Sequence, residues 1–158
     1  MSEVRGPRGV EHFISLKRFA TETPESIALR APGRRPLTYA KLEEAVQSAR
    51  VELRNAGLQD DEVAVLVLPN TPTFITAFIA ITGIGGGAPL NPALTEDEFL
   101  DYLRRLRPSM LLLPAGVSSP AAAAAKALGV RVVRVHENPD DPAGVFTDRK
   151  STRLNSSH

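Results

Sequence analysis

The sequence contains no cysteine in its 158 residues. This absence excludes disulfide bonds, thiolate metal ligands and a cysteine nucleophile, and it leaves the redox compartment undetermined. The first nine residues hold no apolar run, so no secretory signal is predicted. The most apolar stretch, residues 74–90, is interrupted by four glycines and a proline and is too short to span a bilayer. We therefore expect no transmembrane segment.

Charge of either sign is not in excess, because 19 basic and 18 acidic residues give a formal net charge of +1. This balance favours no nucleic-acid partner, and the group Arg104, Arg105 and Arg107 is most simply one solvated helix face. Hydrophobic residues make up 42% and charged residues 23%, as in ordinary globular proteins. The length suits one compact domain or part of a larger one.

The last eleven residues, 148–158, differ from the rest of the chain. They are polar, have no apolar periodicity, and closely resemble the translation of a common sequencing-library adapter. On this interpretation residues 1–147 are the truncated N-terminal part of a domain and residues 148–158 are an artefact. The alternative is a natural disordered tail. The glycosylation pattern at Asn155 belongs to the same segment and carries no weight.

Apolar spacing predicts an alternation of helices and strands along the first 135 residues. Helices are expected at residues 12–23, 38–56, 71–82, 95–106 and 119–129. Strands are expected at residues 26–30, 63–68, 86–90, 110–113 and 130–135. The last four strands alternate with helices, so the predicted fold class is α/β, a partial doubly wound parallel sheet with flanking helices.

Two local patterns support this assignment. The run Val63–Leu68 is continuously apolar and rich in valine, as in a strand covered on both faces of a parallel sheet. The segment Thr95–Glu98 is a complete capping box at the start of a helix. The apolar residues that this helix is expected to bury are Phe99, Tyr102, Leu103 and Leu106.

A glycine-rich segment, Gly83–Ala88, formally matches the dinucleotide fingerprint G-x-G-x-x-G/A. That fingerprint requires a strand before it and a helix after it, so that the helix N-terminus meets the pyrophosphate. Here the expected order is reversed, with a helix before and a strand after. We therefore interpret the segment as a tight helix-to-strand connection.

Other candidate site residues have simpler explanations. A cluster of possible metal ligands is formed by His136, Glu137, Asp140 and Asp141. Acids beside a lone histidine in a proline-rich loop are more typical of a solvated linker. His12 has no second ligand at i+4 and is expected at the surface. No serine lies in a nucleophile elbow and no glycine-rich loop ends in Lys-Ser or Lys-Thr, so we assign no catalytic, cofactor-binding or metal-binding residue.

Several segments, in order, resemble the start of the AMP-binding, adenylate-forming enzyme superfamily. They are Pro36–Tyr39 with Leu42, Leu53–Leu58, Asp61–Asn70, Phe74–Gly83, Ala88–Pro92, Glu98–Phe99 and Tyr102–Leu103. The resemblance covers most of residues 12–135. Asp60 departs from it by standing where the family usually has a glycine. The stretch 88–99 is similar to the branch that contains oxalate–CoA ligases and medium-chain acyl-CoA synthetases.

The resemblance implies the N-terminal subdomain of an ATP-dependent carboxylic acid–CoA ligase. In such enzymes a carboxylate attacks the α-phosphate of Mg-ATP, and the thiol of coenzyme A then displaces AMP from the acyl-adenylate. The family's phosphate loop, acidic hinge and C-terminal lysine all follow the point where this chain ends. We therefore carry over no site residue, expect this chain alone to be inactive, and expect a cytoplasmic parent protein, with a peroxisomal location left open.

Two alternatives remain at this point. The parent could be an adenylation domain that loads a carrier protein instead of coenzyme A. The chain could also be a stand-alone flavodoxin-like module that binds a small ligand, because fold analogy alone does not establish function.

Overall fold

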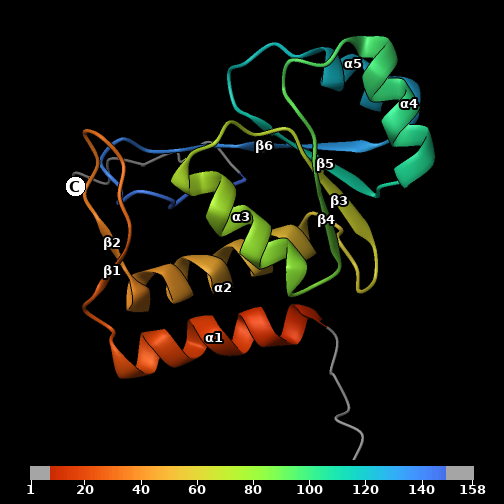
Figure 1. Cartoon of the computed structure of the whole chain (residues 1–158). Helices are drawn as coiled ribbons and strands as arrows, with labels where there is room; N and C mark the ends of the chain where they lie inside the picture. Colours follow the sequence, from red (N-terminus) through yellow and green to blue (C-terminus); the bar gives the residue numbers. More distant parts are fainter. Residues whose placement is uncertain (1–7, 149–158) are drawn as a thin grey trace, which may run out of the picture.

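The computed structural model describes the chain from residue 8 to residue 148, with side-chain environments from residue 15 onwards (Figure 1). The described helices are α1 (Arg8–Glu22), α2 (Tyr39–Asn55), α3 (Pro72–Thr82), α4 (Glu96–Leu106) and α5 (Pro120–Ala127). The described strands are β1 (Ile27–Leu29), β2 (Leu37–Thr38), β3 (Val63–Leu66), β4 (Gly86–Pro89), β5 (Met110–Pro114) and β6 (Arg131–Val135).

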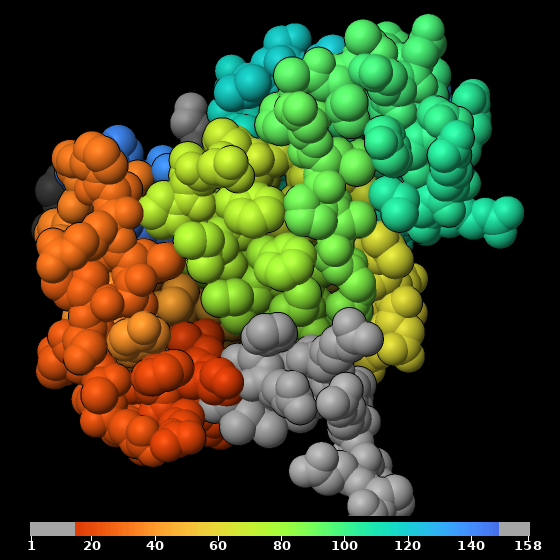
Figure 2. Space-filling view, in the orientation of Figure 1, coloured from red at the N-terminus to blue at the C-terminus, as the bar shows by residue number. Residues whose placement is uncertain are grey.

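Four parallel strands form the main sheet, in the order β4-β3-β5-β6. On one face α1 packs on α2 and α2 packs on α3, while α4 and α5 pack together on the other face (Figure 1). In the space-filling view the surface of α3 lies between the orange N-terminal hairpin and the green-to-teal region of α4 (Figure 2). The predicted α/β doubly wound architecture is thereby confirmed.

The central strand β3 shows why both faces are covered. Ala64 and Leu66 belong to the apolar cluster beneath α2 and α3, whereas Val65 and Val67 belong to the cluster beneath α4 and α5. All four side chains are at most 1% exposed. Because successive side chains of a strand point to opposite faces, a strand buried on both sides needs an uninterrupted apolar run.

The connection from α3 to β4 confirms the interpretation of the glycine-rich segment. A helix precedes it and a strand follows it, so it does not have the context of a dinucleotide-binding loop. The backbone of Gly85 lies so close to the carbonyl oxygen of Glu62 that a Cβ atom would collide with it. The Gly85 N–H donates to the Ile81 carbonyl at 2.9 Å and closes the turn.

The structure also differs from the sequence-based expectations in three places. Tyr102 is 44% exposed and not buried as expected, whereas Phe99 on the same helix is fully buried. Helix α1 begins at Arg8, earlier than expected. Strand β2 was not expected, and it pairs antiparallel with β1 outside the main sheet.

Two sequence-based predictions fall on residues that the structure does not fully describe: the origin of segment 148–158 and the surface position of His12. The adapter-like segment 148–158 lies outside the described residues apart from Asp148, whose N–H donates to the Glu52 carboxylate at 2.8 Å. The side chain of His12 also lies outside the described side chains. The predicted division of the chain at residue 147 therefore stays a prediction.

Candidate functional site: a cavity at the carboxyl edge of the sheet

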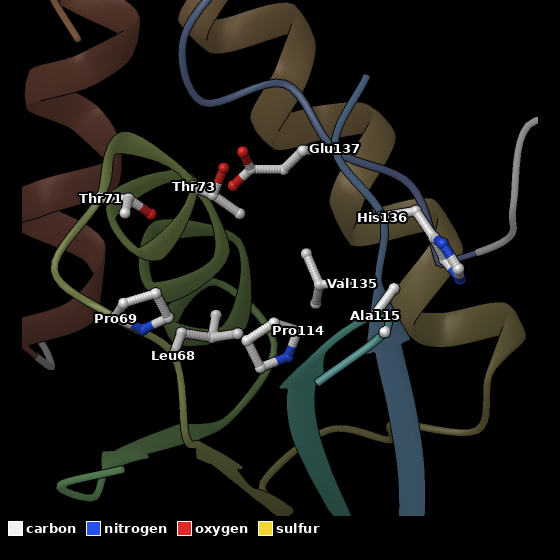
Figure 3. A pocket seen from close by; sticks show the side chains of 10 residues that line it. Leu68, Pro69, Thr71, Thr73, Pro114, Ala115, Val135, His136 and Glu137 are labelled. Carbon is white, nitrogen blue, oxygen red and sulfur yellow. The ribbon is translucent and has the colours of Figure 1, made fainter. Parts of the chain in front are cut away.

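A cavity of about 600 Å³ opens at the carboxyl ends of β3, β5 and β6 (Figure 3). Its lining residues come from three segments of the chain and are Leu68, Pro69, Thr71, Thr73, Pro114, Ala115, Gly116, Val135, His136 and Glu137. The volume falls in the usual range for small-molecule sites. The walls combine apolar side chains with a few polar groups, as such sites generally do.

The strand order explains the position of the cavity. The chain passes from β3 to β4 on one side, and then returns to place β5 on the other side of β3. The connecting helices therefore leave in opposite directions at the carboxyl ends of β3 and β5. In open α/β sheets, ligands bind in the crevice at such a switch point. The cavity lies at this crevice.

The N-terminus of α3 forms one wall of the cavity. The N-cap residue Thr71 has an extended backbone, with φ −127° and ψ 167°, and its side chain makes no capping hydrogen bond. Pro72 follows at the first helical position and has no N–H. Thr73 comes next, is 3% exposed and lines the cavity. The first turn of α3 therefore presents unused hydrogen-bond donors to the cavity.

The opposite wall is the loop that follows β6, which the sequence suggested was a solvated linker. The acids Glu137 and Asp140 are exposed as expected, but the backbone of the loop is fixed by hydrogen bonds from a distant turn. The guanidinium of Arg34 is mostly buried, with 16% of its side chain exposed, and pairs with Glu137 at 3.1 Å. It also donates to the backbone carbonyls of Asn138, Asp141 and Pro142 at 3.1–3.3 Å.

Further contacts hold the two ends of this loop. His136 and Thr147 exchange backbone hydrogen bonds at 2.8 and 2.9 Å. Arg35 donates to the Asp140 carbonyl at 2.6 Å, and its own carbonyl accepts the Ala143 N–H at 2.9 Å. The acids keep solvent contact while their backbone is fixed. No sequence pattern identified Arg34, because most of its partners are main-chain carbonyls.

The candidate metal ligands do not converge. Within the cavity Glu137 extends toward α3, whereas the imidazole of His136 points away from it (Figure 3). Among the side chains of residues 15–148, no group of three His, Asp or Glu is placed to hold a metal ion. The chain also lacks a phosphate loop, so its described residues do not fit Mg-ATP and no adenylation step is assigned to them.

The arginines of α4 follow the sequence-based interpretation. Arg104, Arg105 and Arg107 are all exposed, and Arg105 pairs with Asp101 one helical turn away at 2.8 Å. They line no part of the cavity. Their position on a solvated helix face is confirmed.

A family model described as "AMP-binding enzyme" matches residues 16–156. The chain belongs to this family. The match covers the whole doubly wound sheet and extends into the adapter-like segment, whose origin stays a prediction. Within residues 8–148, no helix combines the length and apolar character needed to cross a membrane.

Two curated relatives and one solved structure illustrate the family. The chain is 34% identical over 117 residues to the oxalate–CoA ligase of Arabidopsis thaliana, covering 73% of this chain and 23% of the ligase. It is 35% identical over 113 residues to a probable CoA ligase of Humulus lupulus, covering 70% of this chain and 22% of that protein. The solved structure is o-succinylbenzoate CoA synthetase of Bacillus subtilis with its acyl-adenylate intermediate. It superposes with a TM-score of 0.68 at 22% identity, and the match covers 81% of this chain and 31% of the synthetase chain.

These matches set the scale of the comparison. The chain spans less than a quarter of the length of the two curated relatives. The solved structure, at 22% identity, establishes the fold alone. The comparisons therefore establish the family and the fold, and the activity of the whole protein is proposed below.

Proposed function

We propose that this chain is the N-terminal part of an ATP-dependent carboxylic acid–CoA ligase. The observation that carries the proposal is the alignment with two CoA ligases over 70% and 73% of the chain. The aligned family region contains all four strands of the doubly wound sheet. The substrate would be a small carboxylic acid, and the resemblance of residues 88–99 to the oxalate–CoA ligase branch makes dicarboxylic and medium-chain acids the first to test.

In this proposal the cofactors are ATP, Mg²⁺ and coenzyme A, all handled by the remainder of the polypeptide. ATP would supply the leaving group by which the carboxylate becomes an acyl-adenylate, with attacking and leaving oxygens held in line. The chain's own residues supply a scaffold whose buried strands hold the carboxyl edge in place. A cytoplasmic location is part of the proposal for the parent protein, with a peroxisomal location left open.

The decisive experiment first extends the gene beyond the codon for Thr147, using adapter-trimmed DNA from an independent preparation. The encoded full-length protein is then assayed for acid-dependent exchange between ATP and pyrophosphate. We expect exchange with one class of carboxylic acid, followed by AMP release that depends on coenzyme A. The 158-residue chain serves as the control and should show no exchange.

The result has clear alternatives. AMP release that requires a phosphopantetheinylated carrier protein, and not coenzyme A, would assign the parent to the carrier-loading adenylation domains. Absence of acid-dependent exchange in the full-length protein would refute the proposal. So would exchange catalysed by the 158-residue chain.

A second candidate function is a stand-alone module that binds a small ligand. The observation that favours it is the cavity, which is formed entirely by residues between Leu68 and Glu137. This candidate requires a native stop codon directly after Thr147 and a single cooperative unfolding transition of the isolated chain. A reading frame that continues would eliminate it.

A further inference from the structure

Thr73 carries two hydrogen-bond donors that the described residues do not use. Its backbone N–H lies in the first turn of α3, where no preceding carbonyl accepts it. Its hydroxyl has no hydrogen-bond partner among the described residues, and the residue as a whole is 3% exposed. The described buried side-chain atoms that lack a partner do not include this hydroxyl, so it is open to the cavity and can donate to a ligand there. Both belong to a residue that lines the cavity.

Glu137 supplies an unused acceptor to the same cavity. Its carboxylate extends toward Thr73 in the close view (Figure 3). One oxygen, Oε2, accepts from Arg34 Nη1 at 3.1 Å. The other oxygen, Oε1, has no hydrogen-bond partner among the described residues. Because Arg34 holds the first oxygen, the second is oriented and remains available.

The charges of the cavity argue against an anionic ligand. Glu137 is the one carboxylate among the lining residues. It is balanced by Arg34 and by the partial positive charge at the N-terminus of α3. An anion placed against Glu137 Oε1 would be repelled by that carboxylate, with some screening because 38% of the Glu137 side chain is exposed. A neutral group avoids this cost.

The remaining walls are apolar and define the rest of the ligand. Leu68 and Val135 belong to the hydrophobic core, and Pro69 and Pro114 add rigid apolar surface. These side chains can bury a short hydrocarbon body but cannot pair with polar atoms. A ligand that fits the cavity therefore combines a small apolar body with one polar end.

We propose that the cavity binds a small molecule with a neutral amide end, whose carbonyl accepts from the two Thr73 donors while its N–H₂ donates to Glu137 Oε1. A primary amide has an acceptor and donors side by side, which matches the unused groups on the two walls. The apolar body lies against Leu68 and Val135. This inference does not depend on the proposed ligase function, because every group that it uses belongs to the 158-residue chain.

The test uses the ¹⁵N-labelled 158-residue chain, titrated with butanamide and, separately, with butanoate at pH 7. The two probes have the same hydrocarbon body and differ at the polar end. We expect a saturable shift of the Thr73 amide resonance with butanamide, with a dissociation constant on the order of millimolar, as befits a ligand of six heavy atoms. Butanoate should bind at least roughly fivefold more weakly, because it cannot donate to Glu137 and is repelled by it.

Four variants, one of them a control, separate the roles of the two walls. Thr73→Val removes one donor and should weaken butanamide roughly fivefold, whereas Thr73→Ser retains the hydroxyl and should bind like the original chain. Thr82→Val, at the far end of the same helix, is the matched control and should not change binding. Glu137→Gln should reverse the preference, because butanoate then meets Arg34 without a competing carboxylate.

Several outcomes would overturn the inference. Tighter binding of butanoate than of butanamide by the original chain would show that the site is an anion site. Equal effects of Thr73→Val and Thr82→Val would show that Thr73 is not a contact. Absence of any saturable shift at high butanamide concentration, in a chain with native amide dispersion, would show that the cavity does not bind amides.

Discussion

Nη1 of Arg34 lies 3.1 Å from Oε2 of Glu137, joining two residues 103 positions apart in the chain. The same guanidinium donates to three backbone carbonyls of the loop after β6. A planar guanidinium is suited to this task because its donors are fixed in a fork. The contact connects the turn between β1 and β2 with one wall of the cavity.

Replacement of Arg34 by alanine should lower the free energy of unfolding by about 3 kcal/mol, because it leaves one carboxylate and several partly buried carbonyls without a partner. Arg18→Ala is the matched control, since Arg18 pairs with Glu22 at 3.0 Å on an exposed helix surface. An exposed pair of this kind is worth at most about 0.5 kcal/mol. Urea denaturation measures both values. Similar losses in the two variants would contradict the role given to Arg34.

Three glycines in one connection should respond differently to alanine. Gly85→Ala places a Cβ atom against the Glu62 carbonyl oxygen and should cost about 3 kcal/mol or more, since the backbone cannot easily move. Gly83→Ala meets the guanidinium of Arg50, a flexible side chain, and should cost about half as much. Gly86→Ala meets only a Val63 methyl group at 3.4 Å and should be nearly neutral. Thermal unfolding ranks the three variants, and any other order would contradict the packing described.

Two threonines at helix starts offer a direct comparison of capping. Thr95 accepts from the Glu98 N–H at 3.3 Å and completes a capping box, whereas Thr71 makes no capping hydrogen bond. Thr95→Ala should therefore cost about 1 kcal/mol and Thr71→Ala only a few tenths. Chemical denaturation of the two variants tests this difference. A larger loss at Thr71 would show that its hydroxyl caps α3 in solution.

Replacement of two aromatic residues on α4 should have different effects on stability. Phe99 is fully buried beneath α4 and α5, while Tyr102 is 44% exposed. Phe99→Ala should cost about 4 kcal/mol because it opens a cavity in the core, and Tyr102→Ala should cost less than about 1 kcal/mol. The unfolding free energies of the two variants decide the matter. Equal losses of unfolding free energy in the two variants would show that Tyr102 is buried in the core, as its helical spacing alone predicted.

Much of the fold could be predicted from local patterns in the sequence. The valine-rich run at Val63 identified a strand covered on both faces, and Thr95 with Glu98 identified the start of α4. Tyr102 was misplaced because apolar spacing marks one face of a helix without showing how far the neighbouring elements extend over it. Strand β2 has two residues, too few for any periodicity to appear.

The cavity and its loop could not be predicted in this way. The lining residues come from segments that only the strand order brings together, and no local pattern specifies that order. The loop after β6 owes its fixed position to Arg34, whose partners are mostly backbone carbonyls. Every residue has such a carbonyl, so the sequence of the loop contains no mark of the contact. The donors of Thr73 went unnoticed because the sequence does not show which helix start borders the cavity.

The separation of Arg34 from Glu137 has a consequence for biosynthesis. The ribosome makes the arginine 103 residues before its carboxylate partner. At a synthesis rate of roughly 5–20 residues per second, about 5 to 20 seconds pass between synthesis of the Arg34 guanidinium and synthesis of its hydrogen-bond acceptors. During that interval the turn between β1 and β2 has no loop to dock on. A nascent chain stalled before residue 136 should be cut by protease at residues 30–36, and one stalled well beyond residue 148 should resist.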